Sequence, residues 1–252
     1  MRAGPPPLGQ APARGEKVNG LTFVELMFDI GSVSVLVDSA PAGADLIPVL
    51  PALRPVLPHG GLRPGWVVSV GGSGATAPGA ASLGLALIAG AARSGGWCAA
   101  VGLPDLGVAA AAAMGAEPER LLLVDDPGER WPDVVAALID AVDLVLVRPP
   151  ARPGPTLVRR LAALARRGRC VLVAAGDWSG AQVRLRVAAA EWTGPGAGFG
   201  HLTSRLARIV ATGKGAAGPG RSAWVWLPGP EGAVAPAAAP AAAGRPPLEV
   251  VA

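Results

Sequence analysis

The sequence predicts an α/β fold in which a mostly parallel β-sheet, flanked by helices, continues into antiparallel strands. Up to Gly176, short apolar runs alternate with amphipathic or small-residue stretches, which is typical of a parallel sheet covered on both faces. After Gly176 three strand-like runs follow one another with no helical stretch between them. With 252 residues and 51% hydrophobic content, the chain is long enough to bury the core of one such domain.

The individual elements follow from the apolar periodicity and from the turn residues. Buried strands are expected at WVVSV, WCAAVGL, RLLLVDDP, DLVLVRPP and RCVLVAAG. Helices are expected at ASLGLALIAGAARSG, LGVAAAAAMGAEPER, WPDVVAALIDAV and PTLVRRLAALARRG. The runs VRLRVAAAEWTG, SRLARIVATGKG and SAWVWLPGP alternate polar with apolar residues, which predicts antiparallel strands that extend the sheet.

Composition divides the chain into three parts. Residues 1–45 form an N-terminal extension whose apolar segment, from about residue 20, fits a helix and a strand equally well and is a candidate interaction segment. Residues 46–230 form the main domain. Residues 231–252 are rich in Pro and Ala, which predicts a flexible tail.

Several classes of protein are disfavoured by the sequence. Residues 64–92 carry no charge, which is long enough to mimic a membrane span, but Gly71, Gly72, Gly74 and Pro78 in the middle favour a strand, a turn and a helix. No secretory signal opens the chain, so we expect a cytoplasmic protein, with association with the nucleoid left open. Cys98 and Cys170 lie in apolar runs, which predicts buried free thiols. No cluster of Cys and His has metal-binding spacing, and we predict neither metal nor cofactor.

A glycine-rich turn follows the first core strand, where a phosphate-binding P-loop would lie. This degenerate phosphate loop comprises Gly71, Gly72, Ser73, Gly74 and Thr76. Gly74 and Thr76 match the second glycine and the hydroxyl of G-x-x-x-x-G-K-[ST], but Ala75 replaces the lysine and the loop is shortened. The turn fits a weak anion site at a helix N-terminus and also an ordinary strand–helix turn.

In order and spacing, residues 46–230 resemble the RecA recombinase core. GGLRPGWVVSVGG is similar to that family's entry into the P-loop, and MGAEPERLLLVDDPGERWPDVVAALIDAVDLVLV is similar to the segment that leads to the Walker B strand. The resemblance implies a RecA-like P-loop NTPase fold. It also implies lost catalysis, because Arg148 stands where the Walker B acid would be and Pro104 lies where a catalytic Glu is expected. Asp105 is displaced from that second position.

Within the RecA-like proteins, this set of losses most resembles the ImuA/ImuA′ group of accessory factors of a DNA-damage-induced mutasome. The resemblance implies a pseudo-ATPase that supports error-prone translesion synthesis in the SOS response. Its partners would be an ImuB-like Y-family polymerase homologue and an error-prone polymerase, with self-association and single-stranded DNA as further options. A residual ATPase that uses Thr76 and Asp105 is one alternative, and a SulA-like cell-division inhibitor is the other.

The charge distribution supports an interaction role. Residues 103–143 contain nine acidic residues and two arginines, whereas residues 151–221 contain twelve basic residues and two acidic ones. The DNA-binding candidates are the arginines of one helix and of the late strands: Arg159, Arg160, Arg166, Arg167, Arg184, Arg186, Arg205 and Arg208. A solvated helix surface explains the helical arginines equally well. Trp224 and Trp226 share one strand face, which is expected to pack in the core.

Overall fold

A computed structural model describes residues 21–28, 31–38, 46–71, 79–194, 200–213 and 220–240. The chain divides into two units, residues 1–43 and 44–252. In the first unit, the strands β1 (Leu21–Phe28) and β2 (Gly31–Asp38) form an antiparallel hairpin, with Leu21 opposite Asp38 and Phe28 opposite Gly31. The apolar segment of the extension is therefore β-structure rather than a helix.

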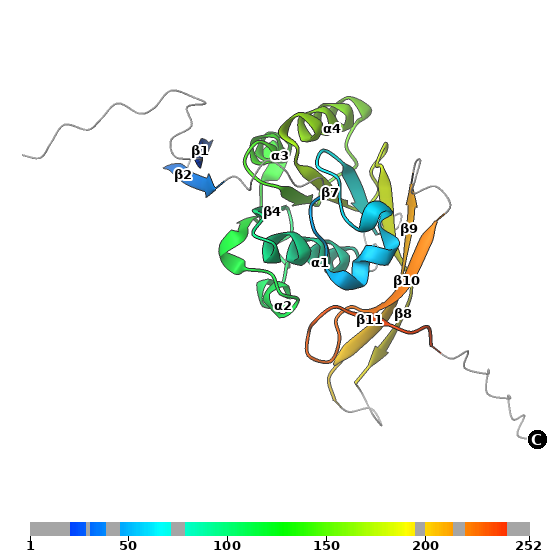
Figure 1. The fold of residues 1–252 in the computed structure, drawn as a ribbon. Helices are drawn as coiled ribbons and strands as arrows, with labels where there is room; N and C mark the ends of the chain where they lie inside the picture. Colours follow the sequence, from blue (N-terminus) through cyan, green and yellow to red (C-terminus); the bar gives the residue numbers. More distant parts are fainter. Residues whose placement is uncertain are drawn as a thin grey trace, which may run out of the picture. The chain divides into compact units, whose positions relative to one another are not determined.

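The second unit is built on a nine-stranded sheet (Figure 1). Its order is β11-β10-β9-β8-β3-β7-β6-β4-β5, in which the five strands from β3 to β5 are parallel. The parallel strands are β3 (Val67–Val70), β4 (Cys98–Val101), β5 (Leu121–Val124), β6 (Leu144–Val147) and β7 (Val171–Ala175). All five were predicted at these positions, and the mixed α/β fold is confirmed.

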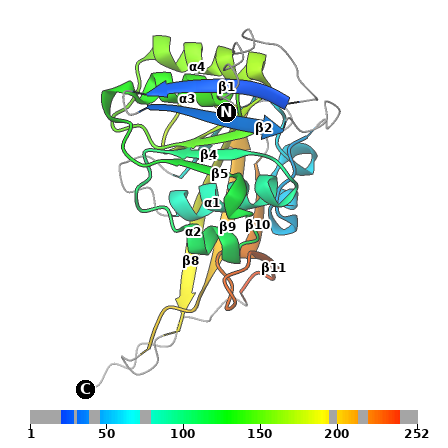
Figure 2. The same cartoon turned by 90° about the vertical axis from the view of Figure 1, so that its left-hand side faces the viewer.

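Helices cover both faces of the parallel strands (Figures 1 and 2). Their bounds are α1 (Ala80–Arg93), α2 (Val108–Ala113), α3 (Trp131–Ile139) and α4 (Pro155–Gly168). On one face α1 packs on β3, β4, β6 and β7, and on the other face α3 packs on β4 and β6 and α4 packs on β7. Helix α1 carries glycine at two positions where its neighbours approach closely: a Cβ at Gly90 would lie 2.6 Å from Val49 Cα, and one at Gly84 would lie 2.8 Å from Leu146 Cδ1.

The antiparallel extension consists of β8 (Val183–Thr193), β9 (Ser204–Gly213) and β10 (Arg221–Trp226), as predicted. Strand β8 joins the parallel part by pairing with β3. One face of the extension packs in the same hydrophobic cluster as α1, through Val183, Leu185, Ile209 and other residues. The proline-stiffened lead-in forms two 3₁₀ turns, η1 (Pro51–Val56) and η2 (Pro58–Gly60), and η1 covers β10.

Two predicted boundaries were wrong. The helix expected from residue 106 to the turn around Glu117 and Pro118 ends earlier, at Ala113, because Gly115 adopts a left-handed φ of 96°; Pro118 then begins a 3₁₀ turn, η3 (Pro118–Arg120). The expected tail starts later than residue 231, since β11 (Ala235–Ala237) pairs with Trp224–Trp226 of β10. Residues 241–252 lie outside the described residues.

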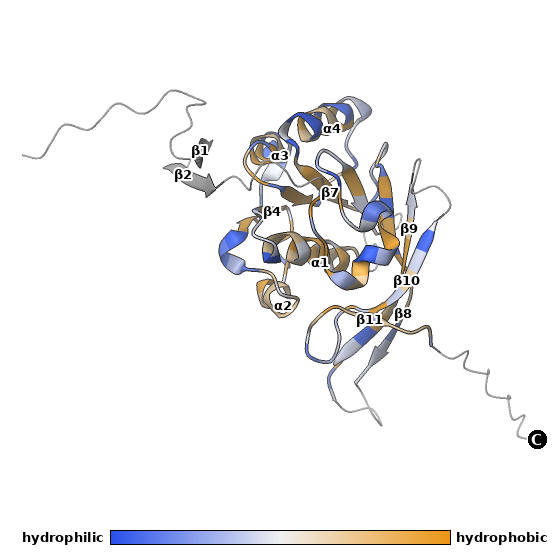
Figure 3. Ribbon diagram, viewed as in Figure 1, coloured by the Kyte–Doolittle hydropathy of each residue, from blue (hydrophilic) through white to orange (hydrophobic). Residues whose placement is uncertain are grey.

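Figure 3 shows the hydrophobic central strands and the mixed hydrophilic and hydrophobic surface of α4. In the part of the chain that the structure describes, no helix is both long enough and apolar enough to cross a membrane. The charge-free stretch at residues 64–92 is divided between β3 and α1, as its glycines predicted.

Candidate functional site

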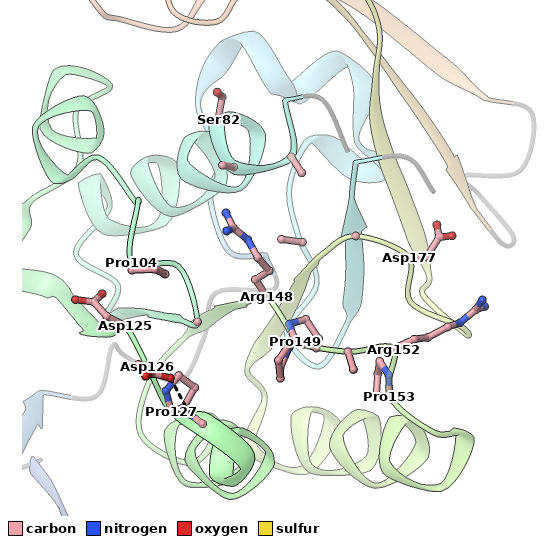
Figure 4. A pocket seen from close by; sticks show the side chains of 18 of the residues that line it. Ser82, Pro104, Asp125, Asp126, Pro127, Arg148, Pro149, Arg152, Pro153 and Asp177 are labelled. Carbon is pink, nitrogen blue, oxygen red and sulfur yellow. Dashed lines mark hydrogen bonds between the residues drawn. The ribbon is translucent and has the colours of Figure 1, made fainter. Parts of the chain in front are cut away.

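A cavity of about 1140 Å³ opens at the carboxyl ends of the parallel strands (Figure 4). Residues that directly follow β4, β6 and β7 line it, together with the first turn of α1 and Arg205 of β9. Its charged side chains are Asp125, Asp126, Arg148, Arg152, Asp177 and Arg205. Parallel sheets bind their ligands at this edge, so the fold places the cavity where a functional site is expected.

Two glycines shape this edge. Gly71, which follows β3, has a φ of 101° and donates its backbone N–H to Leu185 O at 2.8 Å. Gly102, which follows β4, has a φ of 72°, and a Cβ there would lie 2.5 Å from Arg148 O. The chain segments after β4 and β6 thus approach so closely that only glycine fits between them.

Of the degenerate phosphate loop, only Gly71 belongs to the described residues. Gly72, Ser73, Gly74 and Thr76, with Ala75, lie outside them, so the predicted loop geometry stays a prediction. The structure does describe Gly79, which ends this connection with a φ of 78° as the N-cap of α1. No side chain caps the amino end of α1 in the described residues.

Arg148 lies in the cavity at the end of β6, where a magnesium-binding acid would be needed. Its half-buried side chain is directed toward the first turn of α1, which carries Ser82 (Figure 4). Pro104 also lines the cavity, whereas the exposed Asp105 is not among its lining residues. Within the described ranges, no group of three His, Cys, Asp or Glu residues could hold a metal ion. Arg148 thus brings a positive charge to the end of β6, where the RecA-like resemblance places the magnesium-binding acid.

Sequence reasoning missed the acidic and basic residues at the cavity rim. Asp125 and Asp126 follow β5, Asp177 follows β7, and Arg152 follows β6; all four are exposed. Asp126 Oδ1 accepts a hydrogen bond from Gly128 N at 3.2 Å. The position of these four residues could have been predicted from the sequence. Each follows a predicted parallel strand within a few residues, and the carboxyl ends of parallel strands lie at the same edge of the sheet.

The four arginines of α4 are exposed, but they differ in their surroundings. Arg160 Nη2 lies 3.7 Å from Asp133 Oδ1, and Arg167 Nη2 lies 3.8 Å from Asp140 Oδ2, so both arginines face α3. Among the residues that the structure describes, Arg159 bonds only to Thr156 Oγ1 of its own helix, at 3.5 Å, and Arg166 has no ion pair. The predicted stripe is therefore two rows, of which one is paired with carboxylates.

The arginines of the extension divide between the two faces of the sheet. Arg184, Arg186 and Arg208 are exposed on one face of the sheet. Arg184 lies opposite Ser69 of β3, which is on the face away from the core cluster that contains α1. The three arginines therefore lie on the side of the sheet that α4 covers farther along. Arg208 Nη2 donates to Ser222 Oγ at 3.4 Å. The prediction that Arg205 continues this patch was wrong. Arg205 shares its face with Ala207 and Ile209, which pack in the core, and it is only 7% exposed.

Arg205 has a specific environment. Its Nε donates to Leu227 O at 2.7 Å, and its guanidinium lies 5.1 Å from the ring centre of Trp192. Its Nη2 is buried without a hydrogen-bond partner in the described part of the chain. Burial lowers the pKa of Arg205, but a guanidinium stays charged at neutral pH.

The remaining candidates are structural. Trp224 and Trp226 are half-buried on the face that carries Arg208, whereas Val225 between them packs in the core. The expected core packing of the two tryptophans is thus only partial. Cys98 and Cys170 are buried free thiols, as predicted. Burial, followed by the nearby charge of Asp143, raises the pKa of both thiols far above the usual value.

The fold is similar to that of a solved RecA-like protein. The flagellar accessory protein FlaH from Methanocaldococcus jannaschii superposes with a TM-score of 0.51 at 12% sequence identity. The match covers 77% of this chain and 100% of FlaH. At this identity the likeness shows the fold alone, and it confirms the RecA-like prediction.

Sequence comparison gives the family. The uncharacterized protein Rv3395c of Mycobacterium tuberculosis is 39% identical over 147 residues, which cover 54% of this chain and 71% of the relative. Residues 55–180, half of the chain, match the family model described as the MT3502 N-terminal domain. These residues run from the lead-in through β7 and contain most of the lining of the cavity. The chain therefore belongs to the MT3502 N-terminal domain family.

Proposed function

We propose that this chain is a non-catalytic RecA-like accessory protein of the ImuA/ImuA′ type, which supports error-prone translesion synthesis after DNA damage. It acts by binding proteins and, weakly, DNA. The observation that carries the loss of catalysis is Arg148, whose guanidinium occupies the cavity at the end of β6. A cation there repels Mg²⁺ from the position at which RecA-like ATPases bind it.

The surface charges support binding rather than chemistry. The exposed arginines of α4 and of the extension lie toward the same side of the sheet, and only Arg160 and Arg167 among those of α4 lie beside carboxylates in the described residues. The exposed positive charge that is left attracts an anionic partner and raises the rate of encounter. The hairpin β1–β2 offers backbone edges through which a partner strand can pair. We propose an ImuB-like polymerase homologue as the partner, and we do not restrict the contact to one of these surfaces.

The first experiment measures ATP turnover by the purified chain with and without single-stranded DNA. We expect no turnover above background, since removal of such catalytic parts costs several orders of magnitude in rate. DNA-stimulated turnover that is lost in Thr76→Ala would overturn the pseudo-ATPase assignment and would favour the residual ATPase.

The second experiment identifies partners by pull-down from cells treated with a DNA-damaging agent. We expect the mutasome polymerases to be recovered, and we expect a variant without residues 1–40 to recover less of them. Recovery of a tubulin-like division protein alone would favour the SulA-like inhibitor. Recovery of neither class by a folded protein would contradict both functions.

A further inference from the structure

A pocket of about 540 Å³ lies at the amino ends of the parallel strands, at the sheet edge opposite the cavity of Figure 4. We call it the amino-edge pocket. Its lining residues belong to the lead-in or directly precede β3 and β7: Leu46, His59, Arg63, Pro64 and Arg169. Three of them are basic and none is acidic. The lining therefore combines hydrogen-bond donors with two apolar side chains.

Backbone hydrogen bonds hold the segments around this pocket together. Ile47 of the lead-in and Leu62 exchange two of them, with N to O distances of 2.7 and 3.0 Å. Gly65 N donates to Cys170 O at 3.2 Å, which joins the segment before β3 to the segment before β7. A Cβ on Gly65, whose φ is 85°, would lie 3.0 Å from Arg166 Cα, so this turn packs directly on the end of α4. The backbone that carries the basic side chains is thus fixed on both sides of the pocket.

Two of the basic residues have backbone conformations that glycine adopts more readily. His59 has a φ of 64°, and Arg169, the C-cap of α4, has a φ of 57°. Within the described ranges they are the two non-glycine residues with a left-handed φ, and both line the amino-edge pocket. A side chain in this region costs free energy that glycine would not. Fold stability alone therefore does not explain a histidine and an arginine at these positions, whereas a use for their side chains does.

The basic side chains of the pocket have no partner among the described residues. His59, Arg63 and Arg169 are exposed, and no described carboxylate lies within ion-pair distance of them. Their side chains also form no hydrogen bond in the described ranges. Asp140, which follows α3, faces a different arginine, Arg167. The donors of the pocket are therefore available to an anion.

The carboxyl end of α4 opposes this attraction, but only in part. Its dipole brings the equivalent of about half a negative charge to the edge of the pocket. The guanidinium groups of Arg63 and Arg169 each carry a full positive charge at any pH at which the protein is folded. Attraction for an anion consequently outweighs the repulsion from the helix end.

The arrangement of donors favours a phosphate group over a carboxylate. Two guanidinium groups and an imidazole reach the pocket from separate chain segments. A phosphate presents oxygens in several directions and carries close to two charges, whereas a carboxylate presents two oxygens in one plane and carries one charge. Attraction between exposed charges is weak in water, so the more highly charged group gains more from this site.

We propose that the amino-edge pocket binds a phosphate group, free or carried by a small molecule, through Arg63, Arg169 and His59. Leu46 and Pro64 form an apolar wall beside that group. The site shares no residue with the degenerate phosphate loop or with the cavity of Figure 4. Apart from Leu46, its residues fall within the range that matches the family model. It is independent of the proposed role in translesion synthesis.

An NMR titration of the isotope-labelled full-length chain with sodium phosphate, at constant ionic strength, tests the proposal. We expect saturable shifts of the amide signals of residues 59–63 and 169–170, while the amide of Arg148 at the opposite sheet edge stays in place. Phenyl phosphate is titrated in parallel to distinguish the two sources of the group. Tighter binding of phenyl phosphate indicates a phosphomonoester whose organic part contacts Leu46 and Pro64, and equal affinity indicates free phosphate.

Glycine variants separate binding from stability. Arg169→Gly and His59→Gly remove a donor and supply the residue that a left-handed backbone favours, so both should melt at or above the wild-type temperature. Phosphate affinity should nevertheless fall about tenfold in Arg169→Gly and in Arg63→Gln, because each loses a charge-assisted contact. The matched control is Arg159→Gln, which removes an exposed α4 charge with no carboxylate partner in the described residues and should bind phosphate like the wild type.

Three outcomes would overturn the proposal. The first is the absence of saturable shifts at the amino-edge pocket. The second is the same shifts with sodium chloride at equal ionic strength, since they would report screening alone. The third is equal weakening in Arg159→Gln and Arg63→Gln, which would show that only the total charge matters. If a glycine variant melts below the wild type, its side chain has a structural role, and Arg63→Gln then decides the result.

Discussion

The arginines of the cavity and those of α4 belong to one basic half of the sequence, but their surroundings are opposite. Arg160 and Arg167 are mostly exposed, at 57% and 70% of their side chains, and they face Asp133 of α3 and Asp140 just after α3, respectively. Arg205 is almost fully buried and faces no carboxylate in the described part of the chain. The positive charge on α4 is exposed to solvent and partly neutralised by aspartates. The positive charge of Arg205 is removed from solvent and has no carboxylate partner among the described residues.

This difference separates two kinds of arginine. Exposed arginines on a helix attract a polyanion over a wide area, and their effect weakens as salt screens it. A buried arginine without a carboxylate partner in the described residues, such as Arg205, does not reach a polyanion on the surface, and salt screens its charge much less. A count of basic residues does not distinguish the two, since burial and pairing decide the outcome.

The largest difference is expected between the two faces of β9. Arg205→Met should lower the free energy of unfolding by about 2 kcal/mol, because a charged hydrogen bond to Leu227 O and the contact with Trp192 are lost. Arg208→Met, on the exposed face of the same strand, should change it by less than about 0.5 kcal/mol. Urea unfolding of both variants measures the difference. A more stable Arg205→Met would show that the unpaired guanidinium costs more than its contacts contribute.

The faces of β9 also show what the sequence could have revealed. The alternation in SRLARIV puts Arg205 on the same face as Ala207 and Ile209, so its burial followed from strand periodicity once the apolar face was known. The prediction failed because the arginines were grouped by their nearness in sequence. The parallel core was predicted well, since its apolar runs are short, regular and separated by clear turn signals.

Other features could not be read from the sequence. LLLV in β5 looks like a central strand, yet β5 lies at the sheet edge and Leu123 is 42% exposed. Periodicity gives the face of a strand but not its position in the sheet. The pairing of Arg160 and Arg167 with α3 depends on how two helices pack, which no local pattern specifies. Strand β11 forms because β10 offers an edge, not because its three residues favour a strand.

An intermediate effect is expected on DNA binding. Arg159→Ala with Arg166→Ala should weaken binding of single-stranded DNA severalfold, and should make the negative slope of log K against log salt shallower by about 0.7 for each lost phosphate contact. Arg160→Ala with Arg167→Ala should weaken it less, because Asp133 and Asp140 already offset those charges. Fluorescence anisotropy at several salt concentrations measures both. Unchanged affinity in both double variants would make α4 an ordinary solvated surface.

The smallest effect concerns the ion pair between Arg160 and Asp133. Both side chains are more than half exposed and the nitrogen and oxygen are 3.7 Å apart, so screening by water leaves little attraction. A double-mutant cycle with Arg160→Ala and Asp133→Ala, followed by urea unfolding, should give a coupling of at most about 0.5 kcal/mol. When DNA affinity is measured in the same cycle, the coupling between Arg160 and Asp133 should be larger. Asp133→Ala alone removes the carboxylate beside Arg160 and should strengthen DNA binding. If Asp133→Ala leaves DNA affinity unchanged, the carboxylates of α3 do not tune the basic surface, and the distinction between the two rows of α4 fails.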